Sequence, residues 1–323
     1  MPIQQPTYAT PRADLGVAFH EFSAEGMTFA AERALPRLNV PKEAATIGVI
    51  TRENARTVEN RHANGAAFAR VGLTSEDKPY ACVDYGLEGQ LTDRDRDFYM
   101  SDYDAEVETV GVVKTQMQIA KEIRVAAALF NTTTWTGSAL YTDVSAAPWD
   151  AAASDVLGHV RAAVEKVRTN TGIPADTMLI GPVTYKNLKA NTAIIARFTN
   201  PGVLTAAVWQ QFLAEILDLR EIIVADGAYN SAKEGQTASM ADIWSDDYAL
   251  IFKKSVGGSM AAPGLGRTLH WAGPGMSLLA GDVNEVVVQY REEQTESDVF
   301  RVREYVDELI ADAYFGHLLK VDA

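Results

Sequence analysis

The feature that most constrains the fold is a helical pattern between Ser101 and Asn131. Apolar side chains recur there every three or four residues, which predicts one apolar stripe on a helix. Asp102 is placed to cap its start, and at this length the helix would be about 40 Å long. Such a helix is longer than most helices of globular proteins and needs an equally long surface to lie against. The predicted stripe consists of Tyr103, Val107, Val110, Val113, Met117, Ala120, Ile123, Ala127 and Phe130.

Composition describes a soluble globular protein and excludes several classes. The 323 residues are 47% hydrophobic and 22% charged, and they are enough for two domains. No apolar run approaches the roughly 20 residues of a membrane span, and the first sixteen or so residues lack the pattern of a secretory signal. Cys82 is the only cysteine, so neither an internal disulfide nor a cysteine metal site is expected. We therefore expect a protein that is made and folded in a cytosol, with no membrane partner.

The charge balance is strongly acidic. There are 43 acidic and 29 basic residues, which gives a formal net charge of −14. Proteins that grip phosphates normally present a basic face, because counterion release drives their binding. The balance argues against a protein that reads nucleic-acid sequence. It remains compatible with a container for DNA, since it is an advantage for the wall of such a container not to bind the DNA tightly.

The order of expected elements indicates an arm, a long helix and an α/β unit. Residues 1 to about 25 are expected to be extended, and residues 29–35 form a short helix that Pro36 ends. The late strands at 285–290 and 298–306 are the candidates to pack against the long helix. Between about 150 and 255, helices alternate with strands, as in one α/β domain. Other expectations are strands near 47–50 and 80–91, a polar connection over 132–147, a glycine-rich loop over 256–275 and an apolar segment at 309–319.

Residues 51 to about 98 differ from the rest, because charged side chains dominate and large apolar ones are few. One interpretation is a solvated loop. The other is an excursion that packs only against another subunit, which would explain so long a loop in a compact chain. The charged residues concerned include Arg52, Glu53, Arg56, Glu59, Arg61 and Arg70.

No group of residues requires an enzyme, a metal or a cofactor to explain it. The five histidines are scattered, without metal-ligand spacing. The segment from Gly264 to Thr268 resembles a phosphate loop but has Arg267 where that motif needs lysine, so a surface loop is expected. Asp84 and Glu88 are expected to be ordinary solvated carboxylates rather than a catalytic pair. The alternating Asp93, Arg94, Asp95, Arg96 and Asp97 predict surface ion pairs rather than a cation site.

Five segments in this order resemble the major capsid proteins of tailed bacteriophages. The resemblance covers nearly the whole chain from about residue 26, and the most similar branch is the lambda-type head protein without a fused scaffolding domain. It implies an α+β fold, the tailed-phage/herpesvirus-type capsid fold. The implied parts are an N-terminal arm (1–45), an extended β-hairpin loop (46–98), a peripheral domain with a spine helix (99–149 and 276–323) and an axial domain (150–275). The five segments are residues 29–41, 80–96, 171–181, 221–232, and 286–290 together with 298–306.

The resemblance also implies a function. The chain would be a major capsid (head) protein that self-assembles into pentamers and hexamers of an icosahedral shell around packaged double-stranded DNA, which it contacts non-specifically. The implied partners are a portal, a separate scaffolding protein and a decoration protein. The location is the virion, after assembly in the host cytoplasm. The extended loop would lie across a neighbouring subunit, with intersubunit contacts from Arg52, Glu53, Arg56, Glu59, Arg61, Arg70 and Lys78.

Two alternatives stay open at this point. An encapsulin-like nanocompartment would share the fold and enclose an enzyme cargo instead of DNA. An unrelated α/β enzyme would use the glycine-rich loop at 256–275 to bind its substrate, and its activity would depend on Arg267 or Asp226. Some capsid proteins form a covalent cross-link from a loop lysine, but no motif around Lys78 predicts one here.

Overall fold

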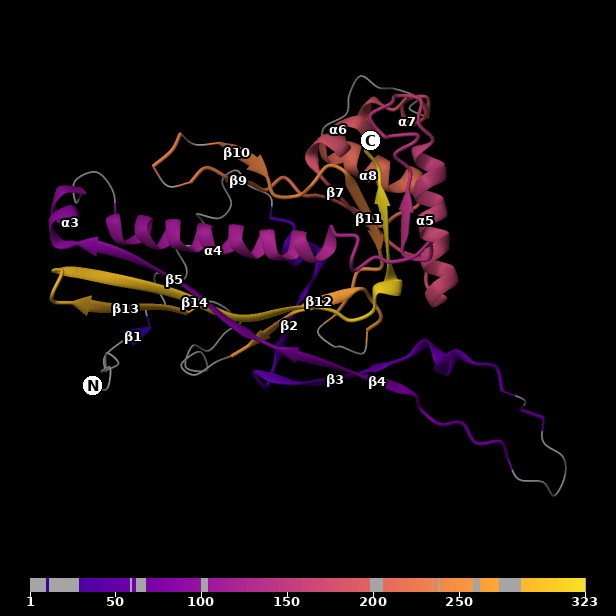
Figure 1. Cartoon of the computed structure of the whole chain (residues 1–323), viewed down its shortest axis with the longest axis horizontal. Coiled ribbons are helices and arrows are strands. Elements are labelled where there is room, and N and C mark those ends of the chain that lie inside the picture. Colours follow the sequence, from indigo (N-terminus) through magenta and orange to yellow (C-terminus); the bar gives the residue numbers. More distant parts are fainter. Residues whose placement is uncertain are drawn as a thin grey trace.

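One long helix, α4, links two β-sheets (Figure 1). The computed structural model describes residues 10–11, 29–58, 60–61, 68–99, 104–197, 206–233, 235–237, 239–257, 262–272 and 286–322. Helix α4 spans Ala105–Leu129, 25 residues or about 37 Å. Asp104 caps its start by accepting hydrogen bonds from the backbone N–H groups of Glu106 and Val107. The expected long helix is thus confirmed, whereas the expected cap, Asp102, lies outside the described residues.

The buried face of α4 agrees with the predicted stripe only in the first half of the helix. Val110, Val113 and Met117 are buried as expected, but Ala120, Ile123 and Ala127 are exposed. The prediction was wrong there because two charged side chains are buried against ionic or hydrogen-bonding partners, which apolar periodicity cannot reveal. The buried residues of the second half are Lys121, Glu122, Val125, Ala126 and Leu129.

A six-stranded sheet lies along the first half of α4, and its longest strand is β14 (Ser297–Ile310). Strand β14 is antiparallel to β5, β13 and β12. Phe300 and Val302 of β14 pack with Val110 and Val113 of α4, which confirms that the late strands pack against the long helix. The other strands are β1 (Thr10–Pro11), β2 (Arg37–Val40), β5 (Val83–Thr92), β12 (Gly266–Trp271) and β13 (Val286–Glu292).

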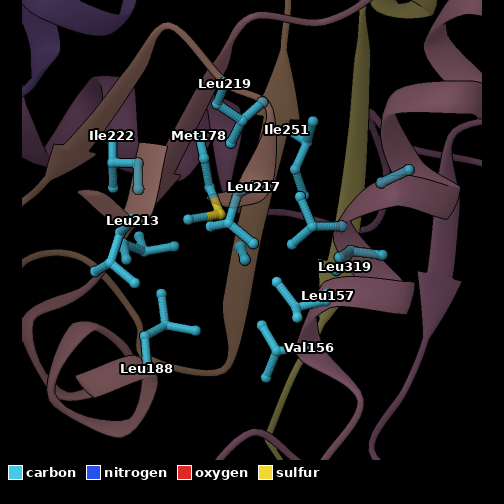
Figure 2. Close-up of a cluster of buried hydrophobic side chains, with 14 of the residues drawn as sticks. Val156, Leu157, Met178, Leu188, Leu213, Leu217, Leu219, Ile222, Ile251 and Leu319 are labelled. Carbon is cyan, nitrogen blue, oxygen red and sulfur yellow. The ribbon is translucent and has the colours of Figure 1, made fainter. Parts of the chain in front are cut away.

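A five-stranded sheet forms the second unit, in the order β6-β15-β11-β7-β8. Helices α5 to α8 cover one face of it, and Figure 2 shows their side chains packed on Met178, Ile222 and Ile251. The opposite face packs on the end of α4 and on α2 (Ala31–Ala34). The strands are β6 (Tyr141–Asp143), β7 (Thr177–Ile180), β8 (Glu221–Val224), β11 (Tyr248–Phe252) and β15 (Gly316–Lys320); the helices are α5 (Val156–Thr171), α6 (Pro182–Ala190), α7 (Thr192–Ile195) and α8 (Ala206–Leu217).

Two stretches expected to be loops contain strands. The glycine-rich segment includes β12, where the buried Arg267 donates hydrogen bonds to the carbonyls of Val256 and Gly257. The surface-loop interpretation was therefore wrong for this part. The connection at 132–147 contains β6, which pairs with β15. Because β12 joins the first sheet while β6 and β15 join the second, the sheets do not follow the expected boundaries at 150 and 275.

Two hairpins and some short helices complete the described fold. The hairpin of β3 (Ala44–Ile50) and β4 (Ser75–Ala81) extends away from both sheets (Figure 1). The strand expected at 80–91 is divided at Cys82, with β4 in the hairpin and β5 in the large sheet. The remaining elements are α3 (Asp93–Tyr99), β9 (Ala228–Asn230), β10 (Met240–Asp242) and the 3₁₀ helices η1 (Arg52–Ala55) and η4 (Ala313–Phe315).

The close approach of α4 to β5 depends on Gly89. A Cβ atom at Gly89 would lie 2.7 Å from Cγ2 of Thr109 and 2.8 Å from Cγ2 of Val113. We expect Gly89→Ala to lower the free energy of unfolding by about 1–3 kcal/mol, because overpacking displaces the helix. Urea denaturation of the purified chain measures this. Gly48→Ala, in β3, is the matched control because its Cβ would meet only Asp77 Oδ1 at 3.9 Å. Equal stability of the two variants would contradict the proposed role of Gly89.

Candidate functional site: the β3–β4 hairpin and its anchorage

The β3–β4 hairpin is an isolated two-stranded element. Its register runs from Ala44 opposite Ala81 to Ile50 opposite Ser75. Within the described residues, neither strand pairs with any other strand. Two-stranded hairpins are only marginally stable in water by themselves, so this one requires support from its root or from a partner.

The root of the hairpin is fixed to the large sheet. The side chain of Asp307 in β14 accepts a hydrogen bond from the N–H of Ala81 at 3.0 Å. Tyr80 and Cys82 are buried in a cluster with Leu269 and Tyr305. Burial raises the pKa of the Cys82 thiol to about 11, with Asp307 and Glu43 adding to the effect, so the thiol stays protonated at neutral pH. The root is thus a packed and chemically inert part of the sheet.

Asn54 closes the neck of the distal loop. Its Nδ2 donates to the carbonyls of Thr51 and Thr74 at 2.8 and 2.6 Å, and its Oδ1 accepts from the N–H of Thr74 at 2.8 Å. These bonds join the chain on both sides just beyond the two strands. These bonds therefore define the neck of the connection between β3 and β4.

The described part of this loop and its neck exposes large apolar side chains. Phe68, Leu73 and Val71 are 76%, 75% and 72% exposed, and Ile50 at the end of β3 is 62% exposed. A group of this kind on a projecting element marks a surface that gains free energy when a partner covers it. The predictions from sequence rested on the charges of this stretch and did not include these side chains, although Val71 and Leu73 are spaced to share one face of an extended segment.

The predicted intersubunit residues differ in their contacts within the chain and in their exposure to solvent. Arg52 contacts its own chain, since it donates to the Asn170 carbonyl at 3.2 Å and its guanidinium carbon lies 3.5 Å from the centroid of the Tyr314 ring. Lys78 lies in β4 opposite Ile47 and is half-buried. Contact of these residues with a second subunit stays a prediction. Glu53, Arg56, Arg61 and Arg70 are exposed, and Glu59 lies outside the described residues.

A buried ionic network fixes the second half of α4 to β14. The Lys121 ammonium lies 2.8 Å from Glu32 of α2 and 3.7 Å from Glu304 of β14. Arg124 pairs with Glu304 at 3.4 Å and with Glu308 at 3.1 Å. The charges alternate in sign, so each buried carboxylate has a cationic partner, which buried ions require. The network explains why this part of the helix buries charged residues.

Glu122 connects α4 to the segment that precedes the hairpin. One carboxylate oxygen accepts from the N–H of Ala31 at 2.6 Å, and the other accepts from Nε1 of Trp244 at 2.8 Å. Burial raises the pKa of Glu122, and these two hydrogen bonds oppose that rise. Helix α2 has no cap from the side chain preceding it, so Glu122 caps it from a distant part of the chain.

Arginine–carboxylate pairs also link the strands at the far end of the sheet. Asp93 pairs with Arg291, whose hydrogen bonds lower the pKa of that carboxyl. Arg96 of α3 contacts Asp298 and Glu106. These pairs confirm the expected surface ion pairing. Asp84 and Glu88 pair with Arg303 and Arg301 at 2.6 and 2.5 Å, so each carboxylate is held by its own arginine.

The described residues offer neither a metal site nor a helix that could span a membrane. No group of three or more histidine, cysteine, aspartate or glutamate side chains is arranged there to hold a metal ion. In the same part of the chain, no helix combines the length and apolar character needed to cross a membrane.

Comparison with known proteins relates the chain to phage structural proteins. No family model matches it. It is 25% identical over 236 residues to the major capsid protein of Burkholderia phage BcepMu, covering 69% of this chain and 71% of the relative. It is 22% identical over 248 residues to the major capsid protein of Pseudomonas phage JBD67, covering 76% of each. The chain is a homologue of phage major capsid proteins.

Solved structures show the same capsid fold over nearly the whole chain. A phage-related protein from Bordetella bronchiseptica superposes with a TM-score of 0.70 at 19% identity, covering 97% of this chain and 98% of that one. The capsid of cyanophage P-SCSP1u gives a TM-score of 0.61 at 15% identity, with 93% and 90% covered. The expected α+β capsid fold of tailed phages is therefore confirmed. The lambda-type branch stays a prediction.

The capsid fold also occurs in a protein compartment. An encapsulin complex from Synechococcus elongatus gives a TM-score of 0.52 at 11% identity, with 95% of each chain covered. Its sequence identity is lower than that of the two phage capsid relatives. The fold alone thus includes both kinds of container, and the sequence similarity favours the phage proteins.

His270 of β12 is a buried polar group beside the α4 network. It lies opposite Val306 of β14 and Asn39 of β2, on the face that bears Glu304. Its side chain is 4% exposed, and neither ring nitrogen has a hydrogen-bond partner in the described structure. Burial, together with the positive charges of Lys121 and Arg37, lowers its pKa from 6.5 to about 2. The folded chain therefore holds this imidazole neutral.

The low pKa of His270 predicts a loss of stability in mild acid. Below pH 6.5 the unfolded chain binds a proton at this residue that the folded chain excludes, so acid favours unfolding. Between pH 7 and pH 5 we expect the wild type to lose about 2 kcal/mol more unfolding free energy than His270→Leu. Urea denaturation at several pH values measures the difference. Parallel pH profiles for the two proteins would contradict the assignment.

Proposed function

We propose that this chain is the major capsid (head) protein of a tailed phage. Its copies assemble as pentamers and hexamers into an icosahedral shell around packaged double-stranded DNA. The observation that carries the proposal is the projecting β3–β4 hairpin with its exposed apolar loop, on a chain of capsid fold related to phage major capsid proteins. Such an element has few stabilising contacts within its own chain, and it gains stability when repeated contacts between subunits close a shell.

The parts of the fold suit the roles of a capsid subunit. The β3–β4 hairpin serves as the extended loop, α4 as the spine helix, and the six-stranded sheet as the peripheral domain. The five-stranded sheet with α5 to α8 serves as the axial domain, which meets its copies around the five- and six-fold axes. The N-terminal arm comprises residues 1–45, of which 10–11 and 29–45 are described and include β1, α2 and β2.

The partners follow from this role. The subunit joins its own copies, a portal, a separate scaffolding protein and a decoration protein, first in the host cytoplasm and finally in the virion. The net charge of −14 suits a wall that contacts packaged DNA only non-specifically. The role is structural and assigns no catalysis to any residue.

A nanocompartment that encloses an enzyme is the second candidate, because an encapsulin shares the fold. The α/β enzyme has less support. Arg267, which it needs for substrate, lies buried within β12 and is bound to two backbone carbonyls. Asp226 is exposed after β8.

Negative-stain microscopy of the purified chain after size exclusion tests the proposal. We expect closed shells tens of nanometres across, or free pentamers and hexamers where a scaffold is lacking. A uniform monomer or dimer at every concentration and salt level would refute it. Nucleic acid inside shells purified from infected or lysogenic cells supports a phage head, and an enzyme cargo supports the compartment.

The exposed arginines of the hairpin supply a second test. We expect the double variant Arg56→Glu, Arg70→Glu to reduce shell yield at least tenfold while the subunit keeps its unfolding midpoint, because surface charge acts on association rather than on folding. The same two positions changed to lysine keep the charge and should assemble. Shell yield is measured by sedimentation. If the glutamate variant formed normal shells, this loop would not be part of the assembly surface.

A further inference from the structure

Arg52 lies where the chain leaves β3 and makes two contacts with the body of its own subunit. It is the first residue of η1, and its guanidinium donates to the carbonyl of Asn170 at 3.2 Å. The same group lies over the ring of Tyr314 at 3.5 Å. These contacts join two distant segments, the end of α5 and the 3₁₀ helix η4, to the far end of the hairpin strands.

Both receiving groups suit a guanidinium and are themselves held in place. Asn170 lies in the last turn of α5, where carbonyl groups point outward at the negative end of the helix dipole. Its side chain donates to the Ala139 carbonyl at 3.0 Å. Tyr314 is positioned by Asp312, whose side chain accepts from the Tyr314 N–H at 2.9 Å. A planar guanidinium can stack on the ring and still donate to the carbonyl, which a lysine ammonium does less well.

A second attachment point has a geometric consequence. The root at Tyr80, Ala81 and Cys82 fixes only one end of the hairpin strands. A two-stranded ribbon held at one end can swing, whereas one held at both ends of its strands has a defined direction. Arg52 supplies the second point, about seven residues along β3 from the root.

We propose that Arg52 is a latch that sets the direction of the β3–β4 hairpin within a single subunit, before a second copy is contacted. This assigns Arg52 an internal positioning role, although Arg52 is exposed to solvent, as Arg56 and Arg70 are. A hairpin already held in one direction loses less conformational freedom when it docks on another subunit. Assembly therefore begins at a lower protein concentration. Only this last consequence rests on the proposed function.

Distance measurement by spin labelling tests the latch in the full-length chain. Labels at Val71→Cys in the loop and Arg161→Cys on α5 report the angle of the hairpin, and the buried Cys82 is not labelled. At concentrations too low for assembly, we expect a narrow distance distribution in the otherwise unchanged chain. Arg52→Ala should broaden its width at least twofold, and Tyr314→Leu should broaden it in the same way. The double variant should broaden it no further than Arg52→Ala, because Tyr314 acts only through Arg52.

Tyr314→Phe is the matched control, since it keeps the ring and should keep the narrow distribution. An unchanged unfolding midpoint shows that the variants are folded. A narrow distribution in either Arg52→Ala or Tyr314→Leu would overturn the latch, whether or not the chain forms shells. Arg52→Ala should broaden the distance distribution and should also raise the protein concentration at which assembly begins several-fold. Arg56→Glu should impair assembly without any broadening.

Discussion

The buried ionic network between α4 and β14 is the constraint on which the rest of the structure depends. Lys121 and Arg124 place two cations against Glu304 and Glu308, where the second half of α4 faces β14. A buried ion that loses its partner is costly, so the network disfavours any register of α4 on β14 that separates these pairs. The network therefore specifies where the second half of the helix lies. That position in turn determines how the two sheets are spaced.

Helix α2 lies at the junction of the two sheets and forms polar contacts with both α4 and β8. Its start is capped by Glu122 of α4, its Glu32 pairs with Lys121, and its Arg33 pairs with Glu221 of β8. Ala31, Glu32 and Arg33 thus connect α4 with the five-stranded sheet, and the chain then continues into β2 of the six-stranded sheet. The chain before α2 is the arm and the chain after β2 is the hairpin. The hairpin, which we assign to contacts between subunits, consequently follows closely on this polar junction, and the same few ion pairs resist its displacement.

Hydrophobic periodicity predicted the elements that bury apolar side chains. It failed where charged side chains are buried and where a strand lies within a glycine-rich stretch. The existence of α4, the late strands and the alternation around α5 and α8 could all be read from the sequence. The second half of α4 could not, because Lys121 and Glu122 resemble surface residues until their partners, about 90 to 180 positions away, are known. Strand β12 was hidden by its glycine-rich surroundings. The hairpin was anticipated from its charges, yet its exposed apolar side chains and the contact of Arg52 with Tyr314 were missed. That contact depends on tertiary structure alone.

The position of β15 has a consequence for the order of folding. This strand is the last of its sheet in sequence order, yet it lies in the interior, between β6 and β11. The side chain of His317 in β15 forms a hydrogen bond with that of Thr142 in β6, 175 positions away in the sequence. The pairings of β15 with β6 and β11 can form only once residues 316–320 are in place. Until then β11 remains an open edge and β6 has no neighbour within its sheet. A growing chain therefore cannot complete its five-stranded sheet, and cannot offer a finished subunit to other copies, before residues 316–320 have been synthesised.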